Sequence, residues 1–518
     1  MRVSRRAIIL PVVLVVISLL ALTMAGFIFF VRAETAGTLA HGDLQQARLA
    51  AESGLEEIIA TLRLNPHDTS VWFDSPGRFR HTLIWSEGYE REDDPVAQTG
   101  TRESLFEEYA VPPHAWRFSA VGDSFVEPSD AESRSMRFGI TPEGSRLHLN
   151  VAEEEQIGRL LTPLLFDLQV ENTEELINAL LDWRDEDDET RDGGAESEYY
   201  NTLEPPYNAK NAPFDSVEEL MLVKGFNAAV LYGEDTNRNG ILDPNEDDGE
   251  ESFPYYDNMD GVLNRGIAPF LTIWTREPDT ALDNRARINL TQDTALVQAQ
   301  IEDTFTEEEL EICEGAVNYI LQQKQQGFNF AQLGSPAELY QGIDALSEEE
   351  RAGGGALANS PITLEELPYV MNRFSIRTAE QLQEGTPGLI NINTAPLRVL
   401  ELIPGLTDET VTNLVEMRPQ QDSTALRTTA WPMTSGAVDI ATFHAMAPYI
   451  TTKSYQFHVE VLGYADHVKV SRRYEWIVEM AGPLAQVRYW RDLSSLGFAW
   501  PIDDEEVAGE GVEMGNID

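Results

Sequence analysis

One short stretch has the residue types and the spacing of a calcium-binding loop. The segment DTNRNGILDPNE, residues 235–246, matches the pattern D-x-[DN]-x-[DN]-G-x5-E. Such a loop offers side-chain oxygens at positions 1, 3 and 5, a backbone carbonyl at position 7 and a carboxylate at position 12. The predicted ligands are Asp235, Asn237, Asn239, Ile241 through its carbonyl, Asp243 and Glu246. We expect a calcium ion here, and a solvated acidic turn is the alternative interpretation.

The elements around this loop predict its type. DSVEELMLVKGFNAAVLYG, residues 215–233, is a plausible entering helix, whereas DDGEESFPYYDN contains glycine and Pro254 and predicts no exiting helix. The sequence therefore predicts an EF-hand-like loop without the full helix pair. Such a loop is typical of a structural calcium site rather than of a calcium sensor whose helices open a groove.

A second acidic loop is also a candidate metal site. In DWRDEDDETRDGGAE, carboxylates crowd into a glycine-containing segment, and such crowding repels itself unless a cation or solvent screens it. The candidate ligands are Asp185, Asp187, Asp188 and Glu196. A solvated acidic loop is the alternative.

Catalytic signatures are missing from the sequence. The eight histidines form no metal-ligand spacing, and neither a nucleophile elbow nor a phosphate-binding glycine motif occurs. Cys313 is the only cysteine, which excludes an intramolecular disulfide and a cysteine-ligated zinc site. We expect no enzyme.

Length and charge limit the partners. With 518 residues the chain is long enough for about three or four domains. It carries 88 acidic and 37 basic side chains, a formal net charge of -51. Phosphate binding needs a basic surface, so nucleic acid is a poor partner.

The N-terminus predicts a membrane span over Ala7–Val31, which contains no charged residue. As a helix it is roughly 37 Å long, more than the about 30 Å of a bilayer's hydrocarbon core. Arg2, Arg5 and Arg6 precede it, so the positive-inside rule places residues 1–6 in the cytoplasm and the bulk of the chain outside. A cleaved secretory signal is the alternative.

After the span the sequence predicts a helix packed on a sheet. Apolar residues recur at three- and four-residue steps from Leu44 to Leu62, so we expect the helix to extend over residues 32–65. A membrane anchor followed by an unrelated core helix is the alternative. Alternating segments follow within 66–150, with TPEGS as a hairpin turn, and again within 450–492. The predicted class is α+β: a long N-terminal helix on an antiparallel sheet, interrupted by a mainly helical insertion over 151–449. Residues 493–518 are expected to be a disordered acidic tail.

The insertion carries an internal repeat and a helical hairpin. The segments SRLHLNVAEEEQIGRLL, ARINLTQDTALVQAQI and GLININTAPLRVLELI each predict a short strand followed by a helix. In the third copy Asn393 or Thr394 is the expected helix cap. ELIPGLTDETVTNLVEMR then resembles a helix-hairpin-helix, a module that often grips DNA. Acidic residues flank it, which favours a packing role.

Taken in order, these segments resemble the K-type minor pseudopilins of type II secretion systems. The resemblance rests on the long N-terminal helix and on RLHLNVAEEEQIGRLL, LLDWRDEDDETRDGGAESEYY, PPYNAKNAPFDSVEELMLVKGF, GLININTAPLRVLELIPGL and RRYEWIVEM. It implies a pilin-like fold with an inserted helical domain, calcium bound in that domain, and no catalysis. It also implies a place at the periplasmic pseudopilus tip, with I- and J-type minor pseudopilins as partners, anchored in the bacterial inner membrane.

The sequence departs from that family at the processing site. Prepilin peptidases cut after a small residue, usually glycine, but here Arg6 precedes Ala7. Pro11 stands at the fifth position from Ala7, where most pilins carry glutamate and K-type subunits generally do not.

Two other functions are compatible with parts of the sequence. A pilus-tip or DNA-uptake protein would use the helix-hairpin-helix, and would bind DNA in a salt-dependent way. A membrane-anchored calcium-dependent hydrolase would need a nucleophile and a base, and none is evident.

Overall fold

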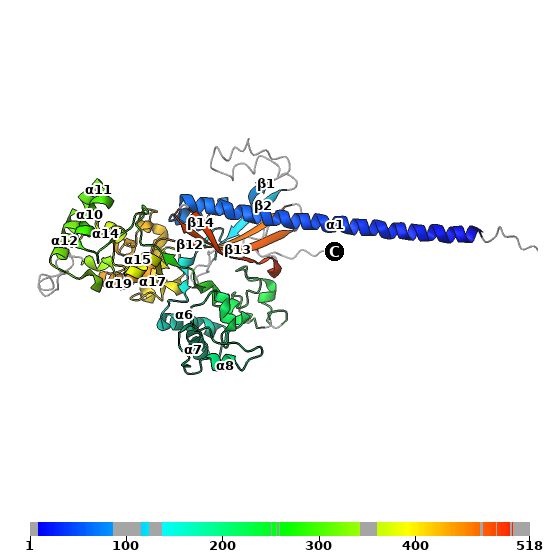
Figure 1. The fold of residues 1–518 in the computed structure, drawn as a ribbon, viewed down its shortest axis with the longest axis horizontal. Coiled ribbons are helices and arrows are strands. Elements are labelled where there is room, and N and C mark those ends of the chain that lie inside the picture. Colours follow the sequence, from blue (N-terminus) through cyan, green and yellow to red (C-terminus); the bar gives the residue numbers. More distant parts are fainter. Residues whose placement is uncertain are drawn as a thin grey trace, which may run out of the picture.

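An antiparallel sheet forms the middle of the molecule (Figure 1). The computed structural model describes residues 9–500 except 86–114, 124–136, 250, 255, 258, 342–359, 467–469, 483 and 498–499. The strand order is β1-β2-β12-β13-β14, with β3 also paired to β12. The strands are β1 Thr82–Trp85, β2 Trp116–Val121, β3 Thr141–Pro142, β12 Gln456–Ala465, β13 Ser471–Ala481 and β14 Leu484–Asp492. The long C-terminal strands predicted at 450–492 are confirmed.

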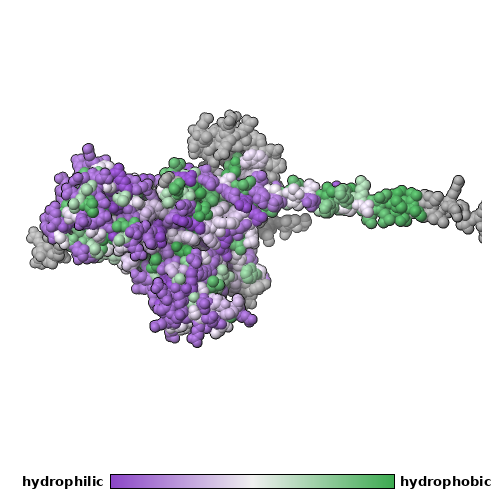
Figure 2. All heavy atoms as spheres, in the orientation of Figure 1, coloured by the Kyte–Doolittle hydropathy of each residue, from purple (hydrophilic) through white to green (hydrophobic). Residues whose placement is uncertain are grey.

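A single helix, α1 Ile9–Leu64, runs from the predicted membrane span onto the sheet. The first half of α1 projects from the body and presents an apolar surface (Figure 2). It is long and apolar enough to cross a membrane. The second half buries Ala47, Ala51, Leu55, Ile58 and Leu62 against the sheet, as their spacing predicts.

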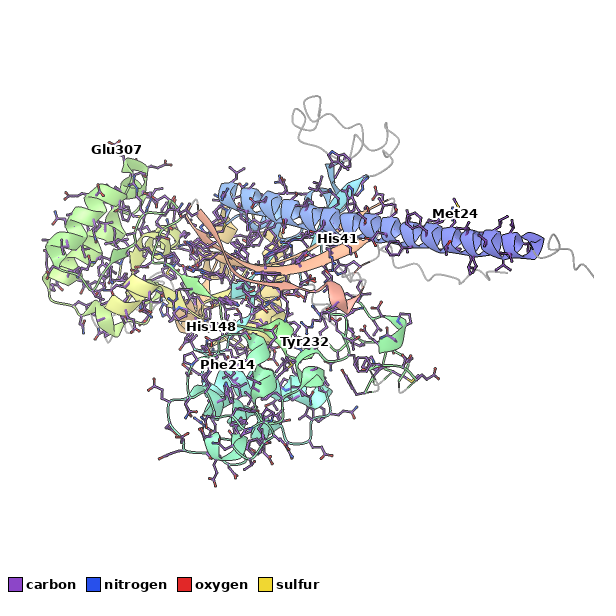
Figure 3. All side chains as sticks on the ribbon, turned by 45° about the vertical axis from the view of Figure 1, so that its right-hand side comes forward. Met24, His41, His148, Phe214, Tyr232 and Glu307 are labelled. Carbon is purple, nitrogen blue, oxygen red and sulfur yellow. The ribbon has the colours of Figure 1, made fainter. Side chains whose placement is uncertain are left out.

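Small residues let α1 lie very close to the sheet. A Cβ on Gly463 of β12 would stand 2.1 Å from the Ala47 carbonyl oxygen. A Cβ on Gly54 of α1 would stand 2.6 Å from the ring of Phe118 in β2. These glycines therefore set the distance between helix and sheet. In Figure 3, Met24 lies on the projecting part of α1 and His41 lies where the helix reaches the body.

The insertion lies between β3 and β12 and has its own hydrophobic core, separate from the core between α1 and the sheet. In its described residues it is mainly helical, with four two-stranded sheets. Its larger helices are α6 Glu154–Asp167, α7 Thr173–Arg184, α10 Thr294–Thr304, α11 Glu307–Ile312, α12 Glu314–Gln325, α14 Leu367–Arg373, α15 Ala379–Glu384, α17 Asp408–Met417 and α19 Ile440–Met446. Shorter helices are α8 Ser197–Tyr200, α9 Ala228–Tyr232, α16 Leu397–Leu400 and α18 Trp431–Thr434, and α2 Thr69–Trp72 and α3 Pro76–Phe79 precede the sheet.

The predicted internal repeat has one structural plan. Each copy is a two-residue strand paired in parallel with a later strand, and a helix follows it. The pairs are β4 Leu147–His148 with β5 Leu271–Thr272, β7 Ile288–Asn289 with β8 Phe374–Ser375, and β10 Ile390–Asn391 with β11 Ile450–Thr451. At the second strand position, His148, Asn289 and Asn391 each accept a hydrogen bond from the backbone N–H two residues later. The remaining pair is β6 Arg276–Glu277 with β9 Thr386–Pro387, antiparallel.

Four local predictions are corrected. TPEGS is not a hairpin turn, because β3 pairs with β12 whereas β4 pairs with β5. In the third repeat the N-cap is Pro396, so the helix begins after the predicted caps Asn393 and Thr394. The segment 215–233 forms a 3-10 helix, Val217–Leu222, and the short α9, because Gly225 with φ +84° lies between them.

The fourth correction concerns the acidic tail. Leu493 donates its backbone N–H to the Arg473 carbonyl, and Trp500 is 5% exposed in the core of the sheet. The part from 493 to 500 is therefore held against the body where it is described. Residues 501–518 lie outside the described residues.

Candidate metal centre

The loop Asp235–Glu246 folds around its own carboxylates. Asp235 accepts backbone hydrogen bonds from Asn239 (2.9 Å) and Gly240 (3.0 Å). Gly240 has φ +71°, a conformation that favours glycine at the sharp turn. Asn237 and Asn239 each accept from the N–H two residues on. The loop backbone thus turns as the sequence motif predicts.

The predicted ligands of this loop meet in two groups. The Oδ2 atom of Asp243 accepts from the side-chain amides of Asn237 (2.6 Å) and Asn239 (3.0 Å). Glu246, 1% exposed, accepts from Thr236 and from the Asp243 N–H. Burial raises the pKa of Glu246 to about 7 and also raises that of Asp235. A cation that replaced these internal donors would favour both charged forms.

The helices around the loop are shorter than the sequence predicts, because the segment 215–233 does not form one entering helix. The short α9 ends two residues before the loop. Only a 3-10 turn, Pro244–Glu246, stands at its end, and the described residues 247–267 contain no α-helix. Within the described chain, the loop is therefore not flanked by a pair of helices that could move apart and open a groove.

Residues of the central sheet and of the C-terminal segment hold the loop through hydrogen bonds, which the motif alone does not reveal. Arg473 of β13 donates to the carbonyl of Asn237 (2.6 Å) and to that of Arg238. Trp500 donates its indole N–H to the Asn239 carbonyl (3.1 Å), and the Arg473 guanidinium lies over its ring. Arg265 approaches Asp235 (3.5 Å) and donates to Asp123. Through these contacts the loop connects the insertion to the sheet.

The second acidic loop forms the more compact carboxylate cluster. Within the described chain, only Asp185, Asp187 and Glu196 bring ligand atoms of three His, Cys, Asp or Glu residues within 4.8 Å of one another. Glu196 is 3% exposed, and neither of its carboxylate oxygens has a hydrogen-bond partner. Burial, and then the neighbouring carboxylate of Asp182, raise the pKa of Glu196 to about 7. A buried carboxylate without a donor is the environment that a cation would complete.

Asp188 lies outside this triad. Its Oδ1 atom accepts from the side chain of Asn211 (3.1 Å), and Asp188 is exposed. Asp182, which the sequence did not single out, is fully buried and accepts from Arg191 and from the Ala195 N–H. Asp182 thus fixes the path of the loop. Nothing in the local spacing distinguished Asp182 from its neighbours.

The donor sets of both loops suit calcium. They consist of carboxylate, amide and carbonyl oxygens, the ligands that this hard cation prefers.

The doubtful processing junction, Arg6 and Ala7, lies outside the described residues.

The glycine turn of the helix-hairpin-helix segment packs inside the insertion. Gly405, between α16 and α17, has φ +87°, and a Cβ there would stand 2.5 Å from the Cβ of Ala445 in α19. Asp408 and Glu409 stand in the first turn of α17. The turn thus contacts protein and is flanked by acidic side chains.

Comparisons with family models and with solved structures each give a match. Residues 143–232 match the model for the type II secretion system (T2SS), protein K. No curated protein matches the sequence. Among solved structures, the fold is similar to a chain in the crystal structure of the GspK-GspI-GspJ complex from the enterotoxigenic Escherichia coli type 2 secretion system. That similarity has 11% sequence identity and a TM-score of 0.39, and it covers 88% of this chain and 98% of that one.

Proposed function

We propose that the chain is a member of the protein K family of type II secretion systems, whose model residues 143–232 match, and that it caps the tip of the periplasmic pseudopilus as a minor pseudopilin. The observation that carries the proposal is the insertion of a separately cored helical domain into a pilin-like sheet. The matched residues 143–232 begin that insertion.

The shape supports a capping role. A pilin-like subunit joins a filament through its long helix, and the apolar half of α1 projects from one side of the body (Figure 1). The helices α10 to α19 lie at the opposite side of the body (Figure 1). Their bulk would stand where a further subunit would have to stack. We propose that the insertion ends filament growth and so supports export across the outer membrane.

The placement in the cell follows from the same helix. We propose that α1 anchors the chain in the inner membrane with residues 1–6 in the cytoplasm and the sheet and insertion in the periplasm. The arginines before the apolar run and the acidic chain after it support this orientation.

The proposed partners are the I- and J-type minor pseudopilins. The test is to co-express the full-length chain with both proteins of the same organism and to purify the tagged chain in detergent. We expect an equimolar three-protein complex on size exclusion, and no equimolar complex when the major pseudopilin replaces both. Failure to retain either minor pseudopilin would contradict the assignment.

We further propose that both acidic loops hold structural calcium. Asp235, Asn237, Asn239, Asp243, Glu246 and the Ile241 carbonyl would hold one ion, and Asp185, Asp187 and Glu196 the other. Asp188 is a candidate outer ligand, since it directly follows Asp187 in the same loop. The ions would neutralise buried carboxylates and thereby fix each loop.

Calcium stoichiometry tests the two sites separately. Equilibrium dialysis of the full-length chain should give two ions for the wild type and for Glu155→Gln, an exposed control in α6. Glu246→Gln should lose one ion, and Asp187→Ala with Glu196→Ala should lose the other. An unchanged stoichiometry after the paired alanine substitutions would count against the second site.

A DNA-uptake role finds no such support. The glycine turn that would face phosphate packs on α19, and its flanking residues are acidic. As a pseudopilin, the chain is a structural component, so we propose no catalytic activity.

A further inference from the structure

A cavity in the insertion is lined by cationic side chains, although the chain as a whole is acidic. It measures about 620 Å³, open solvent included. Its ionisable lining consists of Arg287, Arg377, Arg427, Lys453 and a single acid, Glu277. The whole chain has 37 basic and 88 acidic side chains, so this local reversal needs an explanation.

Two of the repeat units build the cavity. Arg287 precedes β7 and Arg377 follows β8, which are paired strands, and the Arg377 carbonyl accepts from Asn289. Lys453 follows β11, the partner strand of the third repeat. The cations therefore stand on short paired strands of the insertion's core rather than on mobile surface arms.

The acids nearby are engaged, except for the Oδ1 atom of Asp279, which has no hydrogen-bond partner among the described residues. Glu277 is 8% exposed, accepts the Thr451 hydroxyl and lies 3.7 Å from Lys453. Outside the lining, Asp68 pairs with Arg427 at 3.3 Å and Asp279 accepts the Ser375 hydroxyl at 2.6 Å. With these two acids included, four cations face three carboxylates. One positive charge remains in excess.

The excess charge falls on the two arginines of the β7–β8 pair. In the described part of the chain neither Arg287 nor Arg377 has a carboxylate within salt-bridge distance. Arg287 donates to the Asn372 carbonyl (3.2 Å), whereas the Arg377 guanidinium makes no hydrogen bond to the described residues. Guanidinium groups bind planar and tetrahedral oxyanions through paired N–H donors.

The electrostatics agree with this geometry. Burial, and then the charge of Arg287, lower the pKa of Lys453 to about 7 despite its contact with Glu277. Burial also lowers the pKa of Arg377, and Arg287 again acts in the same direction. Arg287 thus lies close enough to both cations to repel them. An anion among the three would relieve that repulsion.

We propose that this cavity is an oxyanion-binding site, in which Arg287, Arg377 and Lys453 hold a single carboxylate or tetrahedral anion. Ser335, Thr428 and Thr429 also line it and offer hydroxyl groups. The ligand fixes the second and third repeats against each other. The site is independent of the calcium loops and of the pseudopilin assignment.

Thermal unfolding of the full-length chain in detergent tests the proposal. Sulfate and acetate serve as the tetrahedral and the carboxylate probe, and sodium chloride at equal ionic strength is the reference. We expect a saturable rise in Tm with at least one probe. No rise above the chloride reference with either probe would overturn the proposal, and the responding probe identifies the anion class.

Arg377→Gln is the decisive variant, because it removes a guanidinium that makes no hydrogen bond to the described residues and should leave the fold intact. Without the anion its Tm should equal or exceed that of the wild type, and its affinity for the probe should fall at least tenfold. Arg398→Gln, an exposed arginine of α16, should bind as the wild type does. A lower anion-free Tm for Arg377→Gln with unchanged probe affinity would show instead that Arg377 pairs with Asp279, and would overturn the proposal.

Discussion

At the scale of single residues, the junction between sheet and insertion rests on a buried charge cluster. Glu475 of β13 accepts from His458 of β12 (3.0 Å) and pairs with Arg491 of β14. Burial opposes its charged form, but the His458 hydrogen bond and Arg491 lower the pKa of Glu475 to about 2. The contact with Glu475 outweighs burial and raises the pKa of His458.

These shifts predict how the stability of the sheet depends on pH. The folded-state pKa of Glu475 is below its ordinary value of 4.5, so its stabilisation is complete above that pH and is lost as pH falls toward about 2. The His458 contribution is complete below its ordinary pKa of 6.5 and is lost as pH rises through the higher folded value. Stability from this pair should therefore be greatest between about pH 4.5 and pH 6.5.

Glu475→Gln should remove that dependence and lower the free energy of unfolding by on the order of 3 kcal/mol near pH 6, because it leaves buried cations unpaired. Urea unfolding, followed by hydrogen exchange of the β12 and β13 amides, measures the effect. Glu155→Gln should keep the wild-type profile. An unchanged profile for Glu475→Gln would show that the cluster does not stabilise the fold.

The sequence could predict ligand types but not which residues support them. Asp235 and Glu246 stand at motif positions, and backbone geometry follows the motif closely. Arg473 and Trp500 clamp the loop from more than two hundred residues away, so no local pattern could reveal them. Trp500 also lies within the segment 493–518, whose composition suggested a disordered acidic tail.

At the scale of elements, the contact between α1 and β12 depends on glycine. Gly463→Ala would place its Cβ against the Ala47 carbonyl, and backbone cannot yield as a side chain can. We expect a loss of about 1–3 kcal/mol in the free energy of unfolding of the sheet. Gly158→Ala in α6, where nothing lies within 4 Å, should stabilise by up to about 1 kcal/mol. Equal changes in the free energy of unfolding for both substitutions, measured by urea unfolding, would refute this role of Gly463 in the contact between α1 and β12.

The contacts that hold the proposed calcium loop give a second prediction at this scale. Trp500→Ala removes the donor to the Asn239 carbonyl and the ring beneath Arg473. A loop held less firmly binds its ion less tightly, and we expect about a tenfold weaker calcium affinity at this site, or about 1.4 kcal/mol. Calorimetric titration of the full-length chain measures it, with Trp490→Ala, 61% exposed on β14, as the control. Unaltered affinity in Trp500→Ala would show that the sheet does not support the loop.

Periodicity predicted elements well and connections poorly. The helix stripe from Leu44 to Leu62 and the strand alternation in β12 and β13 each reflect one buried face, so sequence shows them. The TPEGS segment has turn chemistry, yet β3 and β4 join different sheets because their partners lie far along the chain. The three repeats were visible because each buries the same short strand before its helix.

At the scale of the whole molecule, the described residues of this acidic chain form two large hydrophobic cores and one small cluster. The core under α1 belongs to the pilin-like part, and the larger core belongs to the insertion. The loop Asp235–Glu246 joins them through Arg473, Arg265 and Trp500. In Figure 3, His148 and Tyr232 mark the side of the insertion that faces the sheet. A net charge of -51 makes calcium at such a joint electrostatically favourable.

The central claim is that this chain ends a pseudopilus, and its position in the filament tests that claim most directly. The full-length chain, tagged for gold labelling at its C-terminus, would be expressed with the other pseudopilins, and sheared filaments would be imaged by electron microscopy. If the chain caps the tip, each filament should carry a single label at one end. Labels spaced along the filament length would contradict it.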